Sequence, residues 1–138
     1  MESLNASATL RWKGFRGRIE GASTALSVAT ATQSELGGPG GESNPEELFS
    51  AALANCFTST LTSMARGRGI PLGEIETSVT TRLSWGDGEE HRLTRADMTT
   101  RVESSSAAWW VSIVIGIPPG ELMRSWARAT SRAMVSLV

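Results

Sequence analysis

One long segment, residues 42–69, most constrains the fold because it carries helix signals at both ends. Asn44 can accept hydrogen bonds from the first free backbone N–H groups, Pro45 suits the first helical position, and Glu46 meets the positive end of the helix dipole. Arg66 and the glycines that follow it are typical of a helix end. Between these ends, apolar residues recur at the three-and-four spacing of one buried face. They are Leu48, Phe49, Ala52, Leu53, Cys56, Phe57, Leu61 and Met64.

Length and charge exclude several classes of protein. At 138 residues with 40% hydrophobic content, the chain suits a single domain over residues 1–138. The formal net charge of -1 arises from scattered acidic and basic residues and indicates neither a nucleic acid nor a membrane as partner. No apolar run approaches the ~20 residues of a membrane span, and the N-terminus lacks the features of an export signal. We therefore expect a cytoplasmic protein.

The cysteine and histidine content limits metal chemistry. One cysteine cannot form an intramolecular disulfide, and one cysteine with one histidine cannot complete a four-ligand zinc site. Carboxylates would have to hold any metal, and the sequence shows no spaced carboxylate cluster. The sequence therefore predicts no metal and no cofactor.

The residues before the long helix favour short strands. Residues Ala8–Ile19 alternate loosely and include Gly14 and Gly17, which predicts two strands around a tight turn. Small and β-branched residues predict a third strand over Ala25–Thr32. The segment Glu35–Ser43 is rich in glycine, which indicates a surface loop that leads into the helix.

The residues after the long helix continue the pattern of strands. Apolar and polar residues alternate over Ile75–Trp85, which predicts a strand with one dry face. A turn at Gly86–Gly88 then leads to a more polar partner strand at Arg92–Val102. The apolar run Trp109–Ile117 predicts a buried strand, and an amphipathic pattern predicts a second helix over residues 121–135. This order of elements predicts an α+β fold with antiparallel sheets.

Cys56 is the leading candidate for chemistry, although a lone cysteine on an apolar helical face is more often a small core residue. Reactivity requires a thiolate, and a mid-helix cysteine needs a nearby cation to lower its pKa. The N-terminal hairpin supplies three arginines, Arg11, Arg16 and Arg18. Glu46 lies nearly three turns before Cys56 and could hold such an arginine, or it could simply complement the helix dipole.

The same residues carry a resemblance to a known family. The stretch ELGGPGGESNPEELFSAALANCF resembles the signature of the osmotically inducible protein C and organic hydroperoxide resistance (OsmC/Ohr) superfamily. The similarity extends to the opening RWKGFRGRIEG and to ATSRAMVS near the C-terminus. It implies an intertwined homodimer with buried central helices and two sites at the subunit interface. It also implies thiol-dependent reduction of organic hydroperoxides, with a lipoyl-type protein as one kind of reductant.

The resemblance assigns roles to individual residues. Cys56 aligns with the peroxidatic cysteine that attacks the O–O bond, and Glu46 aligns with the carboxylate that orients an activating arginine. A gap-free alignment places Phe15 at the position of that arginine, with Arg16 beside it and Arg18 two residues further. Because adjacent strand residues face opposite sides, Arg16 can replace it only if the turn is irregular or slipped by one residue. The predicted catalytic residues are thus Cys56, Glu46 and Arg16, with Arg18 as the alternative arginine.

One departure from the family pattern changes the expected mechanism. The family's resolving cysteine aligns with Ala133, so a sulfenic acid on Cys56 has no second thiol in the chain. The sequence therefore predicts a one-cysteine peroxidase that uses an external thiol or dithiol. The alternatives are a non-catalytic dimer that binds a lipid-like or thiol ligand or senses peroxide, and a family member without chemistry.

Overall fold

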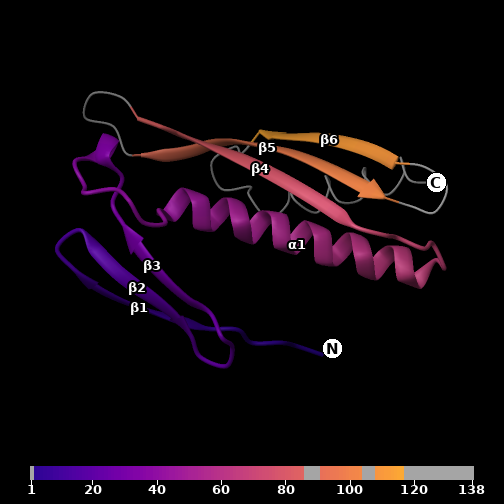
Figure 1. Cartoon of the computed structure of the whole chain (residues 1–138), viewed down its shortest axis with the longest axis horizontal. Coiled ribbons are helices and arrows are strands. Elements are labelled where there is room, and N and C mark those ends of the chain that lie inside the picture. The colour runs from indigo at the N-terminus through magenta and orange to yellow at the C-terminus, as the bar shows by residue number, and fades with distance from the viewer. Residues whose placement is uncertain (1, 86–90, 104–107, 117–138) are drawn as a thin grey trace. The chain divides into compact units, whose positions relative to one another are not determined.

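Two three-stranded antiparallel sheets and one long helix make up the part of the chain that the structure describes (Figure 1). The computed structural model describes residues 2–85, 91–103 and 108–116. In chain order the elements are β1 (Ala8–Lys13), β2 (Arg16–Gly21), β3 (Ser27–Ala31), the 3-10 helix η1 (Ser34–Leu36), α1 (Pro45–Gly67), β4 (Ile75–Ser84), β5 (Arg92–Glu103) and β6 (Ala108–Gly116). The predicted α+β class is confirmed. These elements belong to two compact units, residues 1–48 and 49–138.

The first unit contains the sheet β1-β2-β3, and its first two strands form the predicted hairpin. Gly14 occupies the first of the two turn positions with a φ of 63°, which suits a two-residue hairpin. Gly17 lies opposite Trp12, and a Cβ on Gly17 would come within 2.6 Å of the Trp12 ring. Glycine at position 17 therefore lets the indole lie against the strand.

The glycine-rich loop of the first unit folds back on β3. Ala31 N donates to Ser43 O at 3.0 Å, and Gly40 N donates to Thr32 O at 3.0 Å. Gly41, with a φ of 78°, adopts a backbone conformation that other residues rarely adopt. These hydrogen bonds hold the loop against the end of β3, and the chain then enters α1.

The start of α1 confirms the predicted cap. Glu47 N donates to Asn44 Oδ1 at 2.8 Å, and Asn44 N donates to Glu47 Oε2 at 3.4 Å. This reciprocal pair satisfies two backbone N–H groups at the helix start. At the other end, Ile70 N donates to Ala65 O at 3.0 Å while Gly69 takes a φ of 69°, which is typical of a glycine-terminated helix.

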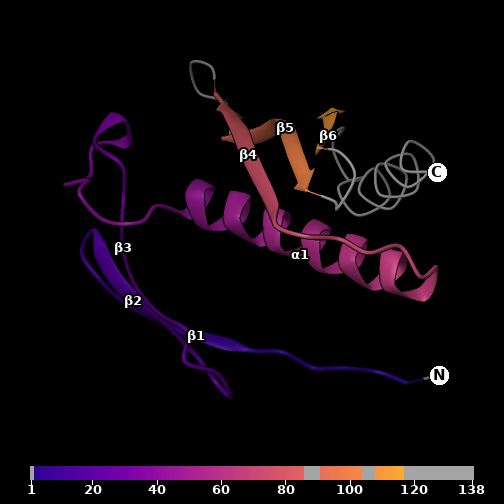
Figure 2. The same ribbon diagram turned by 45° about the vertical axis from the view of Figure 1, so that its right-hand side comes forward.

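The second unit packs the remainder of α1 against the sheet β4-β5-β6 (Figure 2). Phe57 and Leu61 from α1 are buried with Met98 and Val102 from β5. Hydroxyl contacts accompany this core, because Thr58 Oγ1 lies 2.8 Å from Thr77 Oγ1 on β4. The three predicted strands after the helix are confirmed by β4, β5 and β6.

The buried face of α1 is narrower than the sequence predicts. Within α1, only Phe57, Leu61 and Ala65 are buried among the described residues, whereas Ala52 and Cys56 are exposed. A sheet touches one strip of a helix, here the side of Phe57, Leu61 and Ala65. At about 100° per residue, Cys56 lies about 100° and Ala52 about 140° from Phe57, on the side away from Leu61 and Ala65, so both remain outside the contact. The prediction that Ala52 lies on the buried face is therefore wrong for the chain by itself, whereas Cys56, expected on or beside that face, lies beside it.

Some predictions fall on residues outside the description. These are the turn at Gly86–Gly88, the helix over residues 121–135 and the site of Ala133. The single domain over residues 1–138 also stays a prediction. In the described ranges, no helix combines the length and apolar character that a membrane crossing requires.

Candidate functional site

Cys56 lies in α1, and its side chain is exposed in the second unit. The next residue, Phe57, is fully buried, so two successive residues of the helix face the solvent and the core. Thr60 Oγ1 donates to the carbonyl oxygen of Cys56 at 2.8 Å, which is a common hydrogen bond for a threonine within a helix. The thiol of Cys56 is therefore accessible to small molecules, and Cys56 does not belong to the core of its unit.

Polar residues flank Cys56 on the exposed side of α1. Ser59 Oγ donates to Asn55 Oδ1 at 3.3 Å, and both residues are exposed. A hydroxyl and an amide cannot act as a base for the thiol at neutral pH. Neither residue therefore supplies a base for Cys56.

Glu46 lies in the first turn of α1 and belongs to the first unit. Gln33 Nε2 donates to Glu46 Oε2 at 2.7 Å in a partly buried contact. Gln33 immediately precedes η1, where the chain turns into the glycine-rich loop. No local sequence pattern connects Gln33 with a carboxylate 13 residues away, so the sequence does not predict this hydrogen bond.

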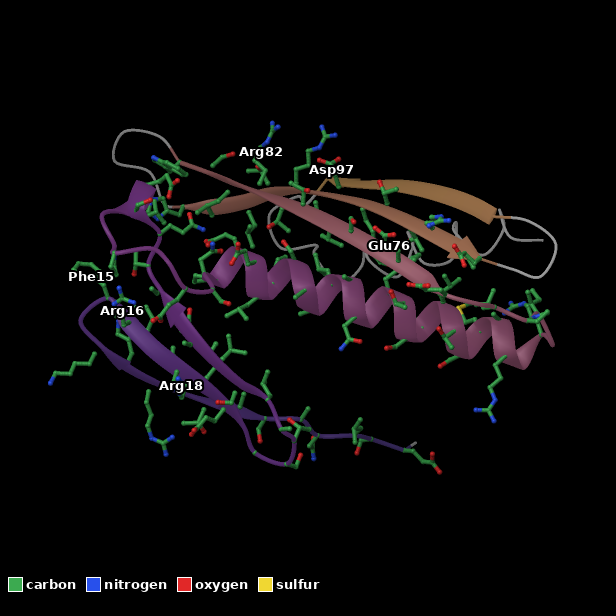
Figure 3. The ribbon with its side chains drawn as sticks, in the orientation of Figure 1. Phe15, Arg16, Arg18, Glu76, Arg82 and Asp97 are labelled. Atoms are coloured by element: carbon green, nitrogen blue, oxygen red, sulfur yellow. The ribbon has the colours of Figure 1, made fainter. Side chains whose placement is uncertain are left out.

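Arg16 is the first residue of β2, and Figure 3 shows it beside Phe15 at the end of the hairpin. Its Nη1 donates to Glu42 Oε1 at 2.8 Å, and both side chains are partly exposed to solvent. The sequence predicts Glu46 as the carboxylate that orients this arginine, whereas the structure pairs the arginine with Glu42. The only feature of the sequence that could have indicated this pair is an acidic residue, Glu42, near the end of the glycine loop.

Phe15 occupies the turn rather than a strand position. Its carbonyl oxygen accepts a hydrogen bond from Thr32 N at 3.0 Å, and its side chain is 57% exposed. The rule that adjacent strand residues face opposite sides therefore does not relate Phe15 to Arg16. Arg18, the alternative arginine, is exposed on β2 and donates from Nη1 to Ser27 Oγ at 3.1 Å.

The described residues offer no metal site of the usual kind. Among them, no three histidine, cysteine, aspartate or glutamate side chains gather closely enough to hold a metal ion. Of the predicted site residues, the accessible thiol of Cys56 thus lies in the second unit, and Glu46, Arg16 and Arg18 lie in the first.

Comparison with known proteins gives a consistent result. The family model described as OsmC-like protein matches residues 38–136. Organic hydroperoxide resistance protein-like 2 of Staphylococcus epidermidis is 31% identical over 94 residues, which cover 67% of this chain and 66% of that protein. An organic hydroperoxide resistance protein of Xanthomonas axonopodis pv. citri is 42% identical over 64 residues, which cover 45% of each chain. The chain thus spans just under two thirds of the first relative and under half of the second.

A solved structure extends the comparison to the fold of nearly the whole chain. The organic hydroperoxide resistance protein OsmC of Legionella pneumophila superposes with a TM-score of 0.59 at 24% sequence identity. The superposition covers 97% of this chain and 91% of that one. The family match over most of the chain and this likeness of fold lead to one conclusion: the chain belongs to the OsmC-like proteins of the OsmC/Ohr superfamily.

Proposed function

We propose that the protein is a thiol-dependent peroxidase that reduces organic hydroperoxides through Cys56. The observation that carries this proposal is the exposure of Cys56 within the segment that matches the family model. A buried cysteine would be inert, whereas an exposed one can meet a peroxide and then a second thiol. The relatives' names, which refer to organic hydroperoxide resistance, agree with this chemistry.

The proposed reaction begins at the thiolate. The Cys56 sulfur attacks one oxygen of the hydroperoxide, the O–O bond breaks, and the other oxygen leaves as an alkoxide that takes a proton to become an alcohol. Sulfur is oxidised by two electrons to a sulfenic acid, and the peroxide is reduced by the same two electrons. This step needs no cofactor.

The roles of Arg16 and Glu46 are part of the same proposal. Arg16 is the proposed activating cation, and Glu46 is the carboxylate proposed to orient its guanidinium group. The hydrogen bond from Gln33 fixes one oxygen of Glu46 and so limits the directions in which the carboxylate can accept. The Arg16–Glu42 pair is partly exposed, and such pairs are weak enough for an arginine to exchange partners.

An external reductant completes the proposed cycle because Ala133 replaces the expected second cysteine. A first thiol condenses with the sulfenic acid, releases water and forms a mixed disulfide with Cys56. A second thiolate attacks that disulfide, which restores Cys56 and leaves the reductant oxidised. A dithiol of the lipoyl type can supply both thiols.

We also propose that the protein works as a homodimer.

The test is reduction of cumene hydroperoxide by the purified protein with dihydrolipoamide as reductant. Wild type should turn over, and Cys56→Ser should lose activity by at least ~10³-fold, because a hydroxyl at this position is not ionised. Ser59→Ala removes a neighbouring hydroxyl from the same helix and should retain activity. Mass spectrometry after one equivalent of peroxide should detect one added oxygen on Cys56.

A different result would point to the second candidate. If wild-type protein is inert with dihydrolipoamide and dithiothreitol, and Cys56 does not gain oxygen, the peroxidase proposal fails. The chain would then serve as a binding protein for a lipid-like or thiol ligand.

A further inference from the structure

Positive charge is concentrated in one short part of the first unit. Four of the chain's 13 lysine and arginine residues fall within residues 11–18: Arg11, Lys13, Arg16 and Arg18. The chain as a whole carries a net charge of -1, so this concentration is local and not a property of the whole protein. A local surplus of one sign on a surface attracts ions of the opposite sign.

The strand register places the four cations on the same face of the sheet. Arg11 lies directly opposite Arg18, and Lys13 lies directly opposite Arg16. Residues directly opposite each other in an antiparallel pair share a face, and so do residues two apart along one strand. The four side chains therefore form two adjacent pairs, which we call the basic face. Figure 3 shows two of its members, Arg16 and Arg18, along β2.

Carboxylates compensate only part of this charge. Arg11 pairs with Glu20 at 2.7 Å and Arg16 pairs with Glu42 at 2.8 Å, and all four of these side chains retain substantial exposure. Among the described residues, no carboxylate forms an ion pair with Lys13. Like charges directly opposite in a sheet are destabilising, so an anion on this face would relieve repulsion.

Arg18 also retains unneutralised charge. Its Nη1 donates to Ser27 Oγ at 3.1 Å, and a hydroxyl does not neutralise a guanidinium group. The basic face therefore keeps a surplus of about two positive charges, counted as four cations less two carboxylates.

The basic face also has a shape that can hold a small ligand. A shallow hollow of about 420 Å³ is lined by all four cations together with Trp12 and Glu42. This volume lies within the range of sites for small molecules. Glu42 is the one acidic residue in the lining, and its pairing with Arg16 reduces its repulsion of an anion.

We propose that the basic face binds a small molecule with two adjacent phosphate groups. The pairs with Glu20 and Glu42 are exposed and weak, so a ligand can displace these carboxylates, and each cross-strand pair then presents two positive charges. A phosphate group carries a charge of about -1.5 to -2 at neutral pH, so each pair matches one phosphate. A carboxylate carries half of that charge and matches less well. Guanidinium groups also bind phosphate oxygens in a bidentate manner. The basic face shares Arg16 with the proposed peroxidase chemistry, whereas Arg11 and Lys13 take no part in that reaction, so variants of these two residues test the binding of phosphate groups alone.

Isothermal titration calorimetry with pyrophosphate at low ionic strength tests the proposal. Wild type should bind pyrophosphate more tightly than inorganic phosphate or citrate. Lys13→Gln and Arg11→Gln should each weaken binding by roughly threefold to tenfold, the usual range for one exposed charged contact. Arg66→Gln, at an exposed arginine near the end of α1, should bind as wild type does.

A gain of affinity provides a check that loss of folding cannot imitate. Glu20→Gln removes the carboxylate that competes for Arg11 and should tighten pyrophosphate binding by roughly threefold. Lys13 is the only lysine in the sequence, so amine acetylation followed by peptide mass spectrometry reports on it directly. Pyrophosphate should slow acetylation of Lys13 by a similar factor.

Three results would overturn the proposal. The first is no heat of binding for pyrophosphate with wild type together with unprotected Lys13. The second is equal affinity in wild type, Lys13→Gln and Arg11→Gln. The third is tighter binding of a single-stranded oligonucleotide than of pyrophosphate through the same residues, which would make the basic face a nucleic-acid site.

Discussion

At the scale of single residues, adjacent positions on α1 have opposite environments. Phe57 is fully buried against β5 residues, whereas Cys56 is exposed one position earlier. The 100° turn between successive helical residues produces this contrast. The same geometry lets one helix hold the core together and present a thiol to solvent.

Asp97 shows how one neighbour can set the pKa of a residue on the side of the β4-β5-β6 sheet away from α1 (Figure 3). Hydrogen bonds from Arg95, of which the Nε contact to Oδ2 measures 2.7 Å, lower the pKa of Asp97. The charge of Arg82 lowers this pKa further, as a smaller effect. Because the folded-state pKa is lowered, the Asp97 carboxylate stabilises the fold above its unfolded pKa, and this contribution is lost as the pH falls through the folded pKa.

Replacement of Arg95 by glutamine should raise the pKa of Asp97 toward its ordinary value. The reason is the loss of the charged donors that favour the ionised carboxylate. Carboxyl ¹³C NMR titration measures the change. Arg101→Gln is the matched control, since Arg101 pairs with Glu103. An unchanged Asp97 pKa in Arg95→Gln would show that Arg95 does not hold this carboxylate in solution.

At the scale of elements, α1 depends on signals at its ends more than on a broad apolar face. Its N-terminus has a reciprocal cap between Asn44 and Glu47, and its C-terminus passes into glycines. The described contacts to β4 are partly hydroxyl pairs, such as Ser50 with Thr81 at 2.9 Å. Local signals therefore determine where the helix starts and ends, while packing determines which side is buried.

Asn44→Ala should lower the free energy of unfolding by about 0.5–2 kcal/mol. The substitution removes the side-chain oxygen that accepts from Glu47 N at 2.8 Å. Asn44→Asp keeps an acceptor in the same place and should lose little stability. Urea denaturation followed by circular dichroism gives the measurement.

The same replacement at a mid-helix position is the control for this prediction. Asn55 is exposed within α1, and Asn55→Ala should not lower stability because alanine favours helix more than asparagine does. If Asn44→Ala and Asn55→Ala unfold at the same urea concentration, the cap at Asn44 contributes nothing measurable.

At the scale of the whole molecule, both units leave apolar or small side chains uncovered. In the first unit, Leu10 is 52% exposed and Leu26 is 45% exposed. In the second unit, Ala51, Ala52 and Cys56 are exposed on α1. Uncovered surface of this kind is typical of protein interfaces, and it supports the proposed homodimer.

Light scattering should give a mass of about twice 14.7 kDa at micromolar concentration. Ala52→Glu places a charge on the uncovered side of α1 and should shift the mass toward the monomer, because burial of an unpaired charge is unfavourable. Ser78→Glu, at an exposed position of β4, should leave the mass unchanged. A monomeric wild-type protein would refute the dimer, and with it a site built from two subunits.

The elements were predictable because each depends on residues close together in the sequence. Alternation over Ile75–Trp85 identified β4, and the two glycines at positions 14 and 17 identified the first hairpin. The candidate residues Cys56 and Glu46 came from a compact motif. The residues that contact the predicted site residues were not predictable from a motif. Gln33 contacts Glu46, and Glu42 contacts Arg16, only because of the way the glycine loop folds.

The sequence by itself determined the family, the helix and its caps, and the strands around them, because local periodicity and terminal signals act over a few residues. Only the tertiary structure decided that Cys56 is exposed beside a buried Phe57 and that Glu42 meets Arg16. It also decided that four cations share one face, since the register of β1 with β2 placed them there. Burial and pairing depend on which surfaces meet, and a one-dimensional pattern does not specify those contacts.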